Sequence, residues 1–321
     1  MNADTIVAAT SEFERARRQA EIERLTSWLL GRDSRLLPFD VIRRNLRQQS
    51  PLYRGIQQVP ADKIIGSVGR YDEMTREFLP LNDALKERWV KMAELAHAEG
   101  WPPIELYKIS EAYFVRDGNH RVSAAKQLKF PTIEAHVWEY PDEIEIDPKD
   151  SLDEVLNRFR ERAFLEKTGL HLRYPSYNIR FTAGGRYPEL QAQIEELRQK
   201  LELIDEREVS LEEAADLWFE LIYLPGVQII RDSGLMEAFP GRTEADLFAW
   251  MSLHRDRLRE SYGDYENLAE LAQSLMKTYR EKPAARVSRQ MRRMLGSDEL
   301  PPLGGLEELE TGTNEGDRAV T

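Results

Sequence analysis

The chain has 321 residues, which is enough for one or two domains that each bury a sizeable core. It is rich in charge, with 32% charged residues, 41% hydrophobic residues and a formal net charge of −12. It contains no cysteine, which excludes disulfides, thiolate catalysis and cysteine-based metal sites. No apolar stretch approaches the ~20 residues of a membrane span, and the first residues lack the features of a secretory signal. We therefore expect a cytoplasmic protein with no membrane partner.

The negative charge is concentrated in the second half of the chain. Residues 1–141 carry 21 Lys and Arg against 20 Asp and Glu, a net charge of +1. Subtraction from the totals leaves 24 against 37, or −13, for residues 142–321. Binding to the DNA backbone depends on Lys and Arg that neutralise phosphates. Bulk charge therefore does not favour DNA as a partner.

Helices are predicted for residues 1–55. Ser11 and Glu14 have the spacing of a capping box, which predicts a helix that runs to Leu30 and stops at Gly31. We expect Leu25, Trp28 and Leu29 to form its buried stripe. A second, short and arginine-rich helix is predicted for residues 36–49.

Residues 56–141 alternate between short strands and helices. Aromatic and β-branched runs predict the strands, and apolar residues at helical spacing predict the helices. The predicted strands cover residues 56–59, 64–65, 104–109, 113–115 and 133–138, and the predicted helices cover residues 84–98 and 122–128. This mixture defines an α+β module of about 80 residues, which is small but large enough to fold.

The most informative feature is the turn that joins the last of these helices to the strand before it. The strand breaks at Asp117 and Gly118 and becomes helical at once. A glycine at such a turn leaves backbone N–H groups free at the helix N-terminus, where they attract anions, phosphate above all. Arg121 is suited to a bidentate grip on the same anion. The alternative is structural, because Asp-Gly is a favoured turn and Asn119 tolerates a left-handed backbone.

Three segments of this module match a known pattern. The turn reads Asp-Gly-Asn-His-Arg-Val-Ser-Ala over residues 117–124. Residues 59–70 contain Val-Pro-x-x-Lys-Ile followed by Val-Gly-Arg, and residues 99–106 read Glu-Gly-Trp-Pro-Pro-Ile-Glu-Leu. With these segments, residues 56–140 resemble the N-terminal module of the ParB/sulfiredoxin superfamily, and the turn is most similar to the Asp-Gly-His-His-Arg of free serine kinases. The resemblance covers about a quarter of the chain.

The resemblance implies a site for a nucleotide, ATP, ADP or CTP, bound together with Mg²⁺. It assigns phosphate binding to residues of the turn and of the first segment, namely Gly118, Asn119, His120, Arg121, Ser123 and Arg70. Asp117 is the candidate general base or Mg²⁺ ligand. Asn119 stands where sulfiredoxins carry their catalytic cysteine, which excludes sulfinic acid reduction. The first-segment glutamate of the serine kinases falls near Gly69 or Arg70, and Asp72 and Glu73 are the nearest carboxylates.

Residues 142–295 are predicted to be mostly helical. Capping pairs precede three of the helices, at Ser151 and Glu154, at Ser210 and Glu213, and at Thr243 and Asp246. Residues 189–204 place apolar side chains at heptad spacing, which favours a packed hairpin with the helix that follows. The region resembles the helical domain of unknown function that accompanies the ParB-like module in some bacterial proteins. Residues 296–321 combine Pro, Gly, Glu and Thr without periodicity and are predicted to be disordered.

Two functions are consistent with this pattern. The first is a nucleotide-binding protein that acts as a phosphotransferase on a small-molecule acceptor, with Asp117 as the general base. The alternative is a nucleotide-gated regulator or DNA-associated protein without turnover, and a third hypothesis is a degenerate module that serves as a scaffold. The helical half is a candidate surface for a homodimer. The spacing of the histidines predicts no protein-bound metal site.

Overall fold

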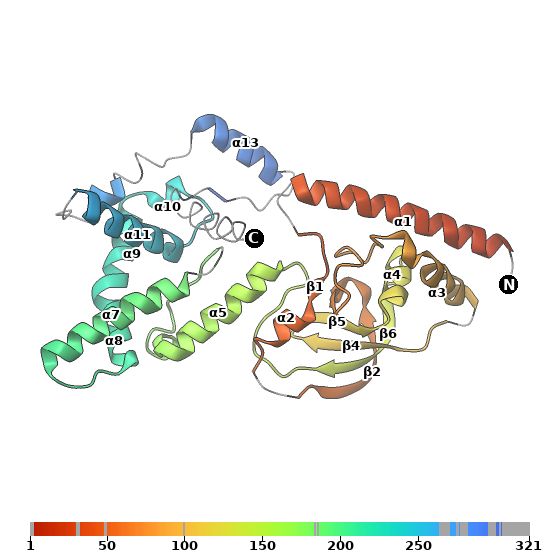
Figure 1. Cartoon of the computed structure of the whole chain (residues 1–321), viewed down its shortest axis with the longest axis horizontal. Helices are drawn as coiled ribbons and strands as arrows, with labels where there is room; N and C mark the ends of the chain where they lie inside the picture. The colour runs from red at the N-terminus through yellow and green to blue at the C-terminus, as the bar shows by residue number, and fades with distance from the viewer. Residues whose placement is uncertain are drawn as a thin grey trace, which may run out of the picture. The chain divides into compact units, whose positions relative to one another are not determined.

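The computed structural model describes residues 3–29, 33–47, 50–98, 100–182, 184, 186–262, 270–273, 276, 282–294, 300, 301 and 303. The chain divides into two compact units, Met1–Phe159 and Arg160–Thr321. The first unit contains a mixed sheet with helices, and the second is helical in its described parts (Figure 1). The predicted α+β class with a helical C-terminal part is confirmed.

One six-stranded sheet forms the centre of the first unit. In sheet order, its strands are β1 (Leu37–Pro38), β3 (Ile64–Ser67), β5 (Ala112–Asp117), β4 (Ile104–Ile109), β6 (Thr132–Glu139) and β2 (Leu52–Pro60). Strands β1, β3 and β5 are parallel, so their carboxyl ends meet at one edge of the sheet. Strand β4 is antiparallel to β5, and the turn between them carries Ser110 with a φ of 51°.

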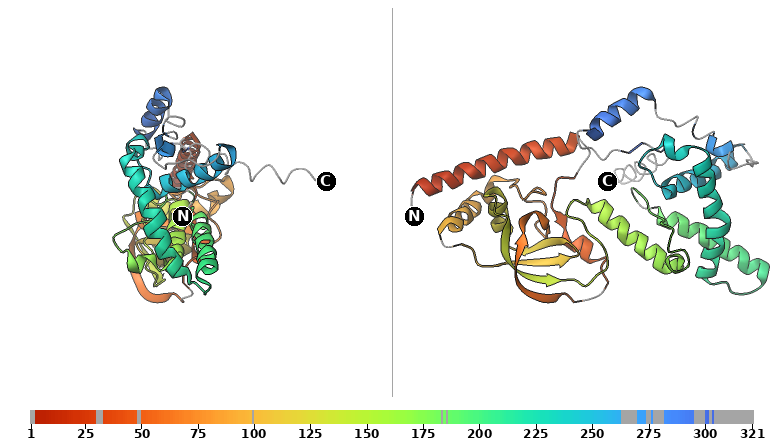
Figure 2. Two further views of the ribbon diagram at one scale, coloured as in Figure 1. Left: turned by 90° about the vertical axis from the view of Figure 1, so that its left-hand side faces the viewer. Right: turned by 180° about the vertical axis from the view of Figure 1, so that it is seen from behind.

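One face of the sheet is covered by α1 (Ala3–Leu29), α3 (Lys86–Ala98) and α4 (Asn119–Gln127). Alternate residues of β4, β5 and β6 point into this layer, because successive side chains of a strand point to opposite faces of the sheet. Phe13 of α1 packs edge-on against Trp89 of α3, with ring centres 5.7 Å apart. Figure 2 shows from behind how α1, in red, runs along this side of the unit.

The other face is covered by a smaller layer. It contains α2 (Phe39–Arg43), residues 140–146 and the first half of α5 (Leu152–Thr168). Phe39 stacks on Tyr107 of β4 at 4.7 Å between ring centres and also contacts Phe114 of β5. Gly66 of β3 lies against this layer, where a Cβ would come within 2.4 Å of the Phe114 ring. Gly66 therefore belongs to β3, which extends beyond the strand predicted for residues 64–65.

The N-terminal helix differs from its prediction in two respects. It begins at Ala3, so Ser11 lies inside the helix and does not cap it. Leu25, Trp28 and Leu29 are exposed, Trp28 by 77%, and the predicted buried stripe is wrong. The buried residues are Ala9, Phe13, Ala16 and Ala20. Ala9 and Phe13 pack in the layer that contains α3, and Ala16 and Ala20 pack with Leu79.

The structure also differs from the prediction for residues 36–60. The short helix predicted for residues 36–49 is only α2, and β1 directly precedes it. Strand β2 begins at Leu52, earlier than the predicted strand at residue 56. Pairing with β6 accounts for the extension, because Leu52 and Tyr53 lie opposite Glu139 and Trp138. A backbone that finds a complete partner strand extends beyond its locally favourable residues.

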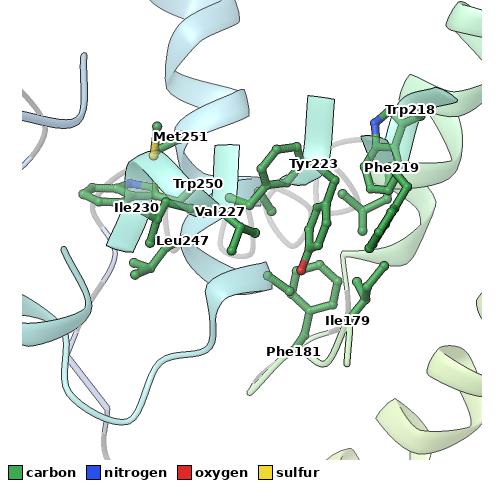
Figure 3. Close-up of a cluster of buried hydrophobic side chains, with 14 of the residues drawn as sticks. Ile179, Phe181, Trp218, Phe219, Tyr223, Val227, Ile230, Leu247, Trp250 and Met251 are labelled. Carbon is green, nitrogen blue, oxygen red and sulfur yellow. The ribbon is translucent and has the colours of Figure 1, made fainter. Parts of the chain in front are cut away.

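The second unit is built from helices around one aromatic core. These are the second half of α5, α6 (Leu170–Arg173), α7 (Tyr187–Asp205), α8 (Leu211–Trp218), a π-helical turn (Phe219–Tyr223), α9 (Leu224–Asp232), α10 (Leu235–Ala238), α11 (Glu244–Tyr262) and α13 (Pro283–Met294). Figure 3 shows Trp218, Tyr223 and Trp250 among the buried side chains of this core. The predicted hairpin of α7 with α8 is confirmed.

The three predicted capping pairs are confirmed. The Ser151 hydroxyl accepts a hydrogen bond from the Glu154 N–H, and Ser210 and Thr243 accept the equivalent bonds at 3.1 Å each. Pro301 and Leu303, which fall in the tail predicted to be disordered, are buried. The rest of that tail, apart from the half-buried Leu300, lies outside the described residues. Among the described residues, no helix has the length and apolarity needed to cross a membrane.

Candidate anion-binding site

The predicted site lies where two parallel strands end. Ser67 of β3 is opposite Val115 of β5, and the N–H of Val68 donates to the Val115 carbonyl at 2.9 Å. The side-chain amide of Asn119, the first residue of α4, donates to the Ser67 hydroxyl at 2.9 Å. Asn119 therefore ties the start of α4 to the end of β3. Carboxyl ends of parallel strands that meet a helix N-terminus are a common place for ligands.

Gly118 makes the turn between β5 and α4. Its φ is 116°, a left-handed conformation, and a Cβ would lie 2.6 Å from Cγ2 of Ile104. No other residue type fits both conditions without strain. The Val122 N–H donates to the Gly118 carbonyl at 3.0 Å. The N–H groups of residues 119–121 precede this first helical hydrogen bond and form the positive end of the helix dipole.

His120 contributes a side chain whose ring nitrogens lack hydrogen-bond partners. Both of its ring nitrogens are buried, and neither forms a hydrogen bond with the described residues. Burial lowers the pKa of His120 below its ordinary value, and the charges of Arg88 and Arg70 lower this pKa further. The imidazole is therefore favoured in its neutral form, which presents one N–H donor and one acceptor.

Two arginines from separate elements are close enough to His120 to act on its charge. Arg70 follows β3, is exposed, and lies 3.9 Å from a carboxylate oxygen of Glu73. The second carboxylate oxygen of Glu73 is buried without a hydrogen-bond partner among the described residues. Arg88 belongs to the first turn of α3, is exposed, and forms no ion pair or hydrogen bond with the part of the chain that is described.

Arg88 was missed by sequence reasoning. It lies in the same predicted helix as Trp89, and its local pattern is that of an ordinary solvent-facing arginine. Only the packing of α3 against α4 brings it to the site. That packing is fixed by a short polar chain: the Trp89 indole N–H donates to the Ser123 hydroxyl at 2.8 Å, which donates to the Phe78 carbonyl at 2.6 Å.

Ser123 therefore has a structural role in the packing of α3 against α4. It was assigned to phosphate binding, but its side chain is fully buried and its hydroxyl is occupied by Trp89 and Phe78. It is one helical turn after His120, so its side chain lies within the packed layer between α3 and α4.

The side chain of Arg121 also binds other groups of the protein. Its guanidinium forms an ion pair with Asp117 and donates to the carbonyls of Pro102 at 2.9 Å and Pro103 at 3.3 Å. The Arg121 side chain is 13% exposed, whereas the Asp117 side chain is 70% exposed. Arg121 thus holds the turn to the segment before β4, and Asp117 presents a carboxylate to solvent at the end of β5.

An open pocket of about 670 Å³ lies elsewhere, in the second unit. It is lined by the end of α5, by α7 and by the start of α8, and none of the predicted site residues belongs to it. Its Arg198 is bound by Glu195 and Glu202 at 2.6 Å each. Within the described residues, no group of three or more His, Cys, Asp or Glu is arranged to hold a metal ion.

Comparison with known protein families found no family model that matches the chain, and comparison with curated proteins found no match.

Proposed function

We propose that the first unit binds a phosphate-bearing ligand, a nucleotide, at the N-terminus of α4. The observation that carries the proposal is His120, whose two ring nitrogens are buried and form no hydrogen bond with the described residues, and whose pKa is lowered by burial and by the charges of Arg88 and Arg70. A buried polar group without a partner costs about 1–3 kcal/mol. A phosphate oxygen would accept the imidazole N–H and remove this cost for one of the two nitrogens. The surrounding arginines favour an anion over a neutral ligand.

The backbone supports the same ligand. Gly118 has no side chain, so a ligand can approach the backbone of the turn closely. The backbone N–H groups that follow Gly118 favour the binding of an anion. In this proposal Gly118, His120, Arg70 and Arg88 contact the phosphates. Asn119 and Arg121 hold the turn in shape through Ser67 and through Pro102. The similarity of the turn to the Asp-Gly-His-His-Arg of free serine kinases supports a nucleotide, ATP, ADP or CTP, as the phosphate carrier.

Phosphoryl transfer is a second candidate function, and the exposure of Asp117 favours it. The carboxylate stands at the end of β5, beside the N-terminus at which the phosphates would bind. It would accept a proton from the hydroxyl of a small-molecule acceptor. Mg²⁺ carried by a nucleotide keeps several waters and needs few protein oxygens, so one carboxylate, Asp117, fits this requirement. A nucleotide-gated regulator would bind the same ligand without turnover.

Calorimetry of the full chain with ATP, ADP and CTP, each with and without Mg²⁺, tests the binding. We expect His120→Phe to weaken nucleotide binding at least tenfold, because phenylalanine keeps the ring volume and removes both nitrogens. His171→Phe, which makes the same change in the second unit, is the matched control and should leave binding unchanged. The proposal fails if no nucleotide binds, or if His120→Phe binds as the wild type does.

Turnover is tested separately. A phosphotransferase releases a nucleoside diphosphate together with a phosphorylated acceptor, and Asp117→Asn should suppress that release while nucleotide binding remains. A regulator should bind nucleotide, release no diphosphate and change its self-association.

A further inference from the structure

We infer that α13 binds the surface of an anionic phospholipid membrane, with its apolar side in the headgroup layer. The inference is independent of the site at α4, because α13 belongs to the second unit. The helix lies on the membrane and does not cross it. Its 12 residues extend only about 18 Å, whereas the hydrocarbon core of a bilayer is ~30 Å thick.

The first argument is the side of α13 that faces outward. Val287, Met291 and Met294 have the i, i+4 and i+7 spacing of one stripe along a helix. All three are exposed, by 56%, 61% and 88%, whereas Arg289 on the opposite side is 2% exposed. A helix at the surface of a globular protein normally turns its apolar stripe toward the core. The packing of α13 is reversed, so its apolar stripe faces the surroundings.

The second argument is the charge around this stripe. The helix carries four arginines and no acidic residue, in a half of the chain whose net charge is −13. Arg286 and Arg292 lie on opposite sides of the stripe, roughly a third of a turn from its centre. Long basic side chains in these positions reach the headgroups when the stripe enters the membrane. Acidic groups more than ~8 Å from the lipid are screened at physiological salt, so the charge of α13 dominates.

The third argument separates a membrane from protein partners. A second α13 would bring four more arginines against the first four, with no acidic residue in either helix to offset them. A protein groove has walls that contact the flanks of a bound helix. One flank of α13 already lies on its own chain, because the Arg293 guanidinium is 3.9 Å from the position of a Cβ on Gly241. An anionic lipid surface needs only the outward face of the helix and supplies the negative charge.

The composition of the stripe predicts how the binding depends on lipid and salt. It contains no aromatic residue, and its three side chains bury little apolar area by themselves. Binding must therefore depend on the charge of the headgroups, and it must weaken as salt screens that charge.

Co-sedimentation of the full chain with vesicles tests the inference. One set of vesicles is phosphatidylcholine, and the other is phosphatidylcholine mixed with phosphatidylserine. We expect the wild type to bind the mixed vesicles at least tenfold more tightly. Met291→Glu, which places a carboxylate in the stripe, should lose at least tenfold in affinity for the mixed vesicles. The matched control is Leu203→Glu, which makes the same charge change at an 81% exposed residue of α7 and should lose less than threefold.

The arginines are tested by the double variant Arg286→Gln and Arg292→Gln, which should also lose at least tenfold in affinity for the mixed vesicles. Thermal unfolding curves that match the wild type show that the variants are folded. The inference is overturned if the wild type sediments with neither set of vesicles, or with both sets equally. It is also overturned if Met291→Glu and Leu203→Glu bind alike. A wild type that is dimeric in analytical ultracentrifugation, with a monomeric Met291→Glu, would overturn it in favour of a second copy of the chain.

Discussion

Arg121 forms an ion pair with Asp117, four residues before it, across the start of α4. The same guanidinium donates to the carbonyl of Pro102, which precedes β4. The residue with the strongest sequence signal for anion binding is thus committed to holding the turn together. His120 and Arg88 are the side chains of the site that form no hydrogen bond or ion pair with the described residues.

Replacement of Arg121 is expected to act first on stability. Arg121→Ala leaves the Pro102 and Pro103 carbonyls without their donor and removes a largely buried side chain, at a cost of about 1–3 kcal/mol in the free energy of unfolding. Urea denaturation followed by circular dichroism measures the change. Arg44→Ala, at an exposed position, should change the free energy by less than ~0.5 kcal/mol. Equal urea midpoints for Arg121→Ala and the wild type would contradict the structural role.

Gly118 is expected to be irreplaceable for two separable reasons. Gly118→Ala forces an L-residue to a φ of 116° and places its Cβ 2.6 Å from Ile104. Gly234→Ala is the matched control, because Gly234 has a φ of 77° with open space around it. We expect Gly234→Ala to cost about 1 kcal/mol in unfolding free energy and Gly118→Ala at least ~2 kcal/mol. A comparable loss in both variants would mean that the contact with Ile104 relaxes at no cost.

The same turn marks the limit of what the sequence can predict. Local patterns were sufficient for α3, α4 and the strands β4 to β6, because their apolar residues recur at the period of one helix face or one sheet face. The exposure of Asp117 and the left-handed Gly118 also follow from local turn chemistry. The burial of Ser123 and the approach of Arg88 do not, since both depend on how two helices distant in sequence pack together.

The stability of the first unit is expected to depend on pH through His120. Its folded pKa is lowered, so the unfolded chain takes up a proton near pH 6.5 while the folded imidazole stays neutral to lower pH. The unfolded state then binds more protons, and the unfolding free energy must fall as the pH drops below about 6.5. His120→Phe lacks this proton uptake.

Urea denaturation of both proteins at pH 7.5, 6.5 and 5.5 measures the effect. The stability of the wild type relative to His120→Phe should be constant above the unfolded pKa and should decline between pH 6.5 and 5.5. The other four histidines are common to both proteins and cancel in the comparison. A difference that stays constant over this range, or that grows in favour of the wild type, would show that burial does not lower this pKa.

The C-terminal tail illustrates a second limit of local patterns. Its composition predicts disorder, yet Pro301 accepts a hydrogen bond from Arg242 at 3.0 Å and Leu303 belongs to the core of the second unit. Two apolar residues among Pro, Gly and Glu have no periodicity that could signal burial. Their place is set by a surface that other helices form, which no local window contains.

Leu303→Ala is expected to destabilise the second unit by about 2–5 kcal/mol, the range for leucine truncation in a packed core. Leu303 is 2% exposed, whereas Leu203 is 81% exposed, so Leu203→Ala is a control of identical chemistry with an expected change below ~0.5 kcal/mol. Urea denaturation of both variants, followed by circular dichroism, measures the change. If the two variants unfold at the same urea concentration, Leu303 contributes nothing to the core, and the tail is as independent of the helices as its composition suggests.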